Sequence, residues 1–161
     1  MPADTSWTWG DVEGDVVPRT DIVPLCLDGT VQRELEDARK HLRAAKAEDA
    51  LGHDTSELQA AVEALEARAE AATKTFEVHA IPHTRWRELL TEHRSSDPQE
   101  RYDASTFVPA AVAACCRQFT SAEQVAKAAD EHLTTGQISK LFTAVRRLNE
   151  GDDQVPFLRG R

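Results

Sequence analysis

Two stretches with helical periodicity, separated by a short break, constrain the fold of this chain more than any other feature. In each stretch the apolar residues recur at steps of three and four, which places them along one face of an α-helix. Leu51-Gly52-His53 interrupts the pattern, and Asp54-x-x-Glu57 offers a capping box for a second helix. We therefore expect an antiparallel helical hairpin with helices at about 30–49 and 56–74. Its seam would consist of Val31, Leu35, Ala38, Leu42 and Ala45, facing Leu58, Val62, Leu65, Ala69 and Ala72.

This hairpin is expected to project as an exposed arm of about 30 Å, because the helical rise is about 1.5 Å per residue. Alanine at about half of the seam positions allows the two helices to approach closely, but it buries little apolar area per residue. The hairpin should therefore be only modestly stable by itself.

Short strands are predicted on both sides of the hairpin. Ile22 to Leu27 is an apolar run with β-branched residues, and Thr75 to Ile81 alternates apolar with polar side chains. Residues 21–81 would thus form a short two-stranded β piece that flanks the hairpin.

The pattern after Pro82 is typical of short packed helices. Thr84, Ser121-x-x-Gln124 and Thr134-x-x-Gln137 are candidate caps for three of them, and a stripe from Val108 to Phe119 marks another. Four amphipathic helices of this size can share one core, which predicts a compact helical domain at 82–150 and a polar tail at 151–161. The expected fold class is mainly α with a small β element.

Residues 1–20 form an acidic segment in which we expect weak order, because few apolar side chains are available to bury. Trp7-x-Trp9 would place two indoles on one face of an extended chain, as in a strand that docks on a partner. The alternative, which we favour, is an edge strand that covers the protein's own sheet.

Composition excludes several classes of function. The 161 residues are 40% apolar and 29% charged, as in one domain with an appendage, and the formal charge of -9 disfavours a nucleic-acid partner. No apolar run approaches the roughly 20 residues that cross a bilayer, and acidic residues occupy the place of a secretory signal. An odd count of 3 cysteines fits free thiols in a reducing cytoplasm.

The sequence contains little that indicates catalysis. It has no Gly-x-x-x-x-Gly-Lys loop for ATP, and Pro82 interrupts the helix that would align His79 with His83 as metal ligands. We therefore expect no catalytic, cofactor-binding or metal-binding residues and no enzyme activity.

The region from Phe76 to Phe157 carries an ordered series of anchors. They are Phe76-x-Val78-x-Ala80-Ile81-Pro82, Trp86-x-x-Leu89-Leu90-x-x-His93, Phe107-x-Pro109-Ala110, Gly136-Gln137, Leu141-Phe142, Leu148-Asn149 and Val155-Pro156-Phe157. In order and spacing this series resembles the tail assembly chaperones of long-tailed phages and prophages of actinobacteria. With Val23-Pro24-Leu25-Cys26-Leu27-Asp28-Gly29 upstream, the resemblance covers about residues 21–157.

The resemblance implies an ATP-independent chaperone in the host cytoplasm that is absent from the mature virion. Its client would be the tape measure protein, a long helical chain that needs cover until tail tube subunits polymerise around it. The expected partner-binding residues are Trp86, Leu90, Phe142, Val155 and Phe157, although burial statistics favour a core role for Trp86. The tail tube protein and a second copy, paired through the hairpin, are further expected partners. A structural coiled-coil adaptor retained in the particle stays open as an alternative.

Overall fold

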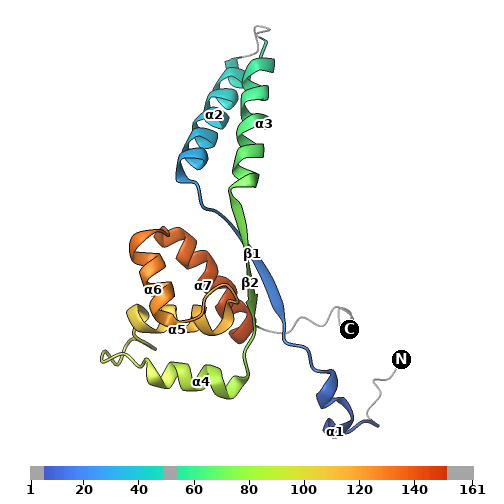
Figure 1. Cartoon of the computed structure of the whole chain (residues 1–161), viewed down its shortest axis with the longest axis vertical. Helices are drawn as coiled ribbons and strands as arrows, with labels where there is room; N and C mark the ends of the chain where they lie inside the picture. Colours follow the sequence, from blue (N-terminus) through green and yellow to red (C-terminus); the bar gives the residue numbers. More distant parts are fainter. Residues whose placement is uncertain (1–5, 49–53, 152–161) are drawn as a thin grey trace.

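A computed structural model describes residues 6–48 and 54–151, and it has the expected class, mainly helical with one small sheet. The hairpin stands at one end of a two-stranded ribbon, the helical domain lies beside the ribbon, and the N-terminal arm, residues 6–17, leaves the ribbon at its other end (Figure 1). The elements are α1 (Trp9–Val12), a 3-10 turn (Glu13–Asp15), β1 (Thr20–Cys26), α2 (Gly29–Glu48), α3 (Ser56–Ala71), β2 (Thr73–His79), α4 (His83–Glu92), α5 (Ala104–Cys115), α6 (Ala122–Glu131) and α7 (Thr135–Glu150).

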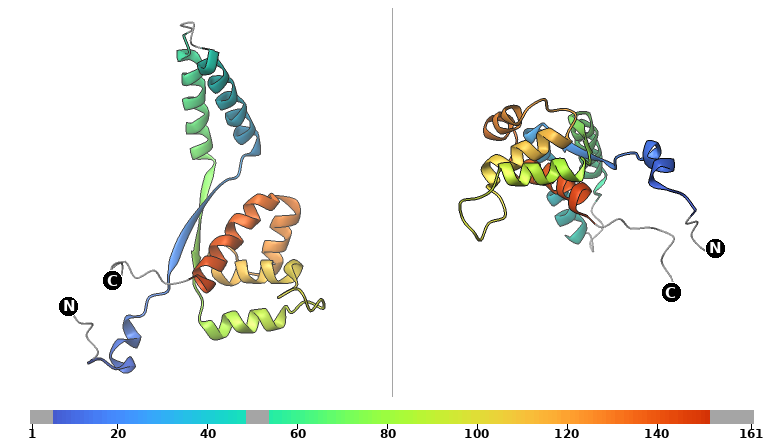
Figure 2. Two further views of the ribbon diagram at one scale, coloured as in Figure 1. Left: turned by 180° about the vertical axis from the view of Figure 1, so that it is seen from behind. Right: turned by 90° about the horizontal axis from the view of Figure 1, so that it is seen from below.

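The predicted hairpin is confirmed as α2 packed against α3, standing clear of the helical domain in Figure 1 and in the left view of Figure 2. Leu35, Leu42 and Val62 form its core, with Ala38, Leu65 and Ala69 beside them, and this cluster is separate from the main core. Arg39 pairs with Glu66 at 2.8 Å and Arg68 with Glu34 at 3.0 Å, but such exposed pairs add little stability. The seam, in which about half of the residues are alanine, therefore gives a narrow hairpin with a small core of its own.

Several local expectations for the hairpin were wrong. Leu58, predicted in the seam, is an exposed residue, and α3 ends at Ala71 because Thr73 already begins β2. The predicted capping box at the start of α3 does not form, because Thr55 rather than Asp54 is the N-cap. Asp54 Oδ1 instead accepts a hydrogen bond from the N–H of Ser56 at 2.9 Å. The predicted break at Leu51-Gly52-His53 lies outside the described residues.

The two predicted strands pair antiparallel, with Val23 opposite Phe76 and Asp21 opposite Val78. Val23, Leu25, Phe76 and Val78 are buried, so one face of the ribbon packs on the helical domain. Both strands begin two residues earlier than predicted. Ala80 then donates from its N–H to the Arg19 carbonyl at 2.8 Å, which closes the open end of the ribbon.

Helices α4 to α7 form the predicted helical domain, and two of the three predicted caps are correct. Ser121 Oγ accepts from Gln124 N–H at 3.1 Å, and Thr134 and Gln137 exchange the two hydrogen bonds of a capping box. The third is wrong because α4 begins at His83, two residues earlier than a Thr84 cap would place it, and Pro82 is its N-cap. Phe119, predicted in the α5 stripe, follows the helix and stacks on Phe76 with ring centroids 5.8 Å apart.

Phe107 lies at the centre of the main core and has no exposed surface. Trp86 meets its ring edge-on with centroids 5.4 Å apart, the Tyr102 ring lies 4.3 Å away, and Phe142 packs edge-on at 5.9 Å. The indole N–H of Trp86 donates to Glu150 at 3.2 Å, so α4 is bound to the end of α7. Aromatic contact thus connects three of the four helices through one side chain.

The N-terminal arm does not form the expected strand. Trp9 begins the one-turn helix α1, and among the described residues the sheet contains only β1 and β2. Both the docking strand and the favoured edge strand are therefore wrong as conformations of Trp7-x-Trp9. Both indoles are exposed, and α1 has no buried residue.

The three thiols are predicted to differ sharply in reactivity. Cys115 and Cys116 are buried, and burial raises the pKa of Cys115 from 9.0 to about 11, whereas Cys26 is only half-buried. At pH 8 a disulfide reagent should modify Cys26 rapidly in the native protein and all three thiols in denaturant, as absorbance of the released thiolate would measure. Rapid modification of all three without denaturant would contradict this packing.

The same burial predicts alkaline destabilisation. The folded-state pKa of Cys115 lies above its unfolded value of 9.0, so the unfolded thiol loses its proton first as the pH rises. The contribution of Cys115 to the free energy of unfolding should therefore be unchanged below about pH 8 and fall between about pH 9 and 11. Chemical denaturation across this range, with Cys115→Ala as the reference, would measure it.

Candidate partner-binding site

A pocket of about 230 Å³ opens on the helical domain where α5, α6 and α7 meet. None of its lining side chains is charged, and most are apolar: Val108, Ala129, Leu133, Ile138 and Phe142, with Thr135 and Ser139. A cavity with such a lining suits one aliphatic or aromatic side chain presented by a partner.

The turn between α6 and α7 fixes one rim of this pocket. The N–H of Leu133 donates to the Ala128 carbonyl at 2.7 Å, which ends α6 tightly. One residue later, Thr134 begins the capping box of α7. Leu133 and Ile138 are therefore held on either side of a short, well-bonded turn, which limits the entropy lost when a partner binds.

Phe142 connects the pocket to the main core. Its half-buried ring lies edge-on to Phe107 and to Tyr102, with centroids 5.9 Å and 6.2 Å apart. This aromatic packing fixes the ring without covering it, so the pocket is lined by a rigid apolar surface.

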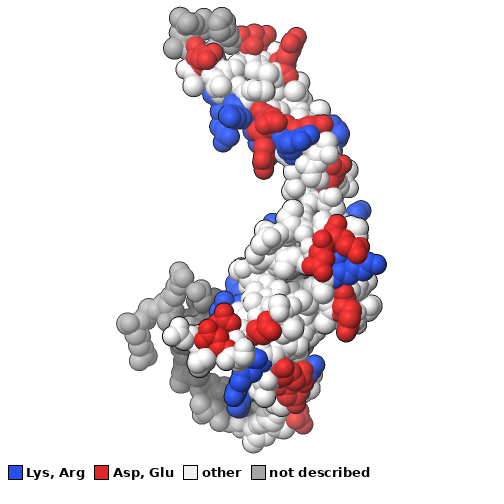
Figure 3. All heavy atoms as spheres, turned by 90° about the vertical axis from the view of Figure 1, so that its left-hand side faces the viewer, with Lys and Arg blue, Asp and Glu red and all other residues white. Residues whose placement is uncertain are grey.

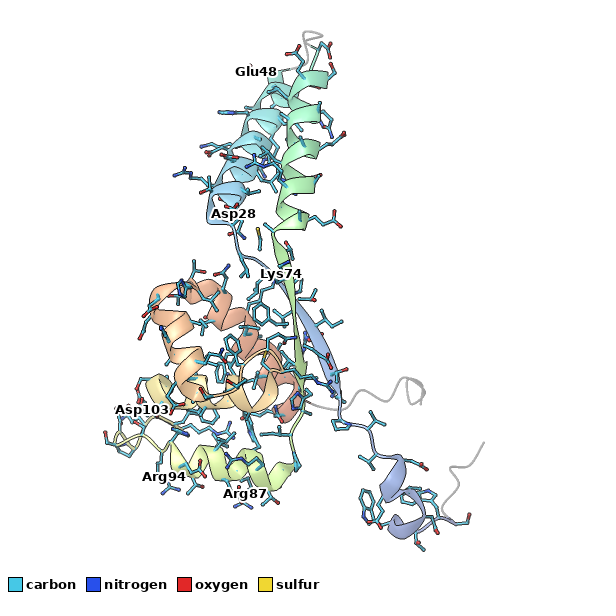
Figure 4. The ribbon with its side chains drawn as sticks, viewed as in Figure 1. Asp28, Glu48, Lys74, Arg87, Arg94 and Asp103 are labelled. Atoms are coloured by element: carbon cyan, nitrogen blue, oxygen red, sulfur yellow. The ribbon has the colours of Figure 1, made fainter. Side chains whose placement is uncertain are left out.

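The charged residues of the domain lie around this area rather than within it. On the side of the molecule in Figure 3, acidic and basic side chains are scattered around a wide uncharged region below the hairpin. The exposed side of α4 is different, because Arg85 pairs there with both Glu88 and Glu92 at 3.3 Å. Arg87 and Arg94 also point away from the domain on that side (Figure 4), as expected of a solvated helix face.

The predicted partner-binding residues do not converge on one surface. Phe142 lines the pocket, and Leu90 is half-buried against the core. Trp86 is only 4% exposed, so its indole is a core anchor in this structure, as burial statistics favoured. Val155 and Phe157 lie outside the described residues.

No protein-family model, curated protein or solved structure matches this chain.

Val108 begins the predicted helical stripe that ends at Phe119, yet it remains half-buried at the pocket, as do Leu133 and Ile138. In the described part of the chain, no group of three or more His, Cys, Asp or Glu side chains could hold a metal ion. Within the same residues, none of the helices combines the length and apolar character needed to cross a membrane.

Proposed function

We propose that this protein is a phage tail assembly chaperone that binds the tape measure protein and keeps it soluble until the tail tube encloses it, without ATP. The observation that carries the proposal is the uncharged pocket around Phe142, on a rigid helical domain whose anchors follow the order of that family. The proposed site of action is the host cytoplasm.

The physical basis is transient cover of apolar surface. A long helical client exposes apolar stripes before the tube surrounds it, and such stripes aggregate in water. An amphipathic client helix could insert one side chain beside Phe142 and rest its neighbours on Leu133 and Ile138. The formal charge of -9 on each bound chaperone would then keep the complex soluble.

The second candidate is a structural adaptor that stays in the particle. It is favoured by one observation, the hairpin with a core of its own, which stands away from the domain and offers a helical surface for coiled-coil contacts. The two functions differ in whether the protein leaves the tail.

Co-expression with the tape measure protein of the same phage tests the pocket. The wild-type chain should raise the soluble yield of the client and co-purify with it, and Leu133→Glu should weaken this binding about 10- to 100-fold. The physical reason is that a buried apolar contact at an interface centre is worth about 2 kcal/mol or more. Pull-down of tagged client at graded chaperone concentrations would measure the loss.

Leu58→Glu is the matched control, because it makes the same exchange at the exposed end of the hairpin. Unchanged binding by Leu133→Glu, with equal thermal stability, would rule out this pocket as the client site.

Mass spectrometry of finished virions separates the chaperone function from the adaptor function. If the protein is a chaperone, almost none of the chain is expected in the virions. Recovery at the stoichiometry of the tube subunit would overturn the chaperone function and favour the adaptor.

A further inference from the structure

Large apolar side chains are exposed mainly at the N-terminal end of the described chain. Trp9 is 62% exposed, Val17 is 81% exposed, and Trp7 and Val16 are also more than half exposed. These residues belong to the segment 6–17, which we call the N-terminal arm. Four exposed large apolar side chains within twelve residues make this segment a candidate interaction surface.

The arm has local order, although its helix α1 contains no buried residue. Asp11 Oδ2 accepts from the N–H of Thr8 at 2.7 Å and from its hydroxyl at 2.8 Å, which closes the turn that begins α1. These hydrogen bonds also lower the pKa of Asp11, so the carboxylate stays charged. A four-residue helix is marginal in isolation, and α1 has no buried residue, so its packing surface is expected on another molecule.

A groove suited to such an arm lies along the outer edge of β1. It has a volume of about 460 Å³, and its walls are β1, with Ile22 and Pro24, and α7, with Gly136, Lys140 and Ala144. Ile22 is 64% exposed in it, and Arg147 lies at its end beside Asp21, with which it forms an ion pair.

The edge of β1 is closed to an added strand, so an occupant must bind through its side chains. Pro24 has no N–H, and its carbonyl accepts from Lys140 Nζ at 3.1 Å. The Cys26 carbonyl accepts from Gln137 at 2.8 Å, and the N–H of Ile22 donates to Asp21 Oδ1 at 2.9 Å. Edges occupied in this way resist open-ended strand pairing.

The arm cannot be placed in its own groove without reversing the chain. It continues from the start of β1 and runs away from the helices in Figures 1 and 2, whereas the groove extends along β1 in the opposite direction. Two copies lying antiparallel about a two-fold axis would place each arm over the groove of the other.

Charge favours the same arrangement. The arm carries Asp11, Glu13 and Asp15 without a basic residue, and the groove carries Lys140 and Arg147 against the single carboxylate of Asp21. Opposite charges at the rim of an interface guide two partners into register and disfavour other pairings.

We infer that the chain forms a two-fold dimer by reciprocal exchange of N-terminal arms, in which Trp9 and its apolar neighbours on one copy fill the β1/α7 groove of the other. This surface is distinct from the hairpin and from the Phe142 pocket. The inference does not depend on the proposed chaperone function.

Sedimentation velocity from about 1 to 100 µM tests the dimer. The wild-type chain should dimerise, and Trp9→Ser should weaken dimerisation at least tenfold while the thermal stability of the monomer, measured at concentrations below the dimer Kd, stays unchanged, because Trp9 is exposed in the monomer. Lys140→Glu should weaken it as well, and Glu13→Lys with Asp15→Lys in the same chain should restore it. A monomer at every concentration would overturn the inference, as would a dimer that Trp9→Ser leaves unchanged.

Disulfide trapping tests the exchange directly. In a Cys26→Ser background, one copy would carry Val16→Cys and a differently tagged copy Thr143→Cys. Oxidation of the mixture should link the two copies, whereas replacing the second variant with Thr91→Cys on the exposed side of α4 should not. Equal linking of both mixtures, or none of either, would contradict the proposed contact.

Discussion

Replacing Trp86 with alanine is expected to lower the free energy of unfolding by about 3 to 5 kcal/mol, the usual range for a large aromatic side chain in a core. The indole is 4% exposed, and it contacts Phe107 edge-on at 5.4 Å. Its loss would also remove the hydrogen bond to Glu150, which leaves α4 without its connection to the end of α7. The variant should be partly unfolded at 37 °C, as urea denaturation followed by circular dichroism would show.

Trp9→Ala is the matched control, because it removes the same side chain from an exposed position. Compared at a concentration at which both proteins are monomeric, it should leave the urea midpoint within the small range typical of surface substitutions. If Trp86→Ala kept the wild-type midpoint but lost client binding, Trp86 would be a surface hot spot and its assignment to the core would be wrong.

Removal of the hairpin should change the circular dichroism spectrum strongly and the stability of the remaining domain little. Replacing residues 29–71 with a short turn deletes α2 and α3, of 20 and 16 residues, together with a cluster that does not contact the main core. The two ends are already adjacent, because Leu27 N–H donates to the Ala72 carbonyl at 3.1 Å. Closing so short a gap has a small entropic cost.

The shortened protein should therefore unfold cooperatively, with a midpoint close to that of the full chain. A chain with equal deletion inside the helical domain, residues 104–146, is the control and should not fold, because it lacks Phe107 and most of α7. Loss of cooperative unfolding in the hairpin deletion would show that the hairpin belongs to the domain rather than being appended to it.

The features predicted correctly from the sequence are those with local causes. The helices of the hairpin follow from a period set by residues three and four apart, and the caps at Ser121 and Thr134 depend on side chains within three residues. Strand β1 followed from an apolar run with β-branched residues and β2 from alternation, although the ends of both strands did not. The end of β2 depends on Asn149, far along the chain, whose side chain accepts from Ile81 N–H at 3.0 Å.

The features that could not be predicted depend on contacts distant in sequence. Nothing near Leu133 or Ile138 indicates that they line a pocket, because their exposure is decided by how α5 crosses α6 and α7. The two Trp positions show the same limit. Local sequence cannot show that Trp86 meets Phe107 while Trp9 meets no side chain of the main core, yet this difference sets their roles.

The first strand of the fold is held by its last described helix, and this order affects synthesis of the protein. Lys140 and Gln137 cover the edge of β1, and Arg147 pairs with Asp21, across sequence separations of 116, 111 and 126 residues. Because a ribosome releases β1 long before α7, the ribbon stays uncovered during most of translation. During this time the open edge of β1 must not pair with strands of other nascent chains on the same messenger RNA. Pro24, placed in the middle of that edge, provides this protection before any other contact exists.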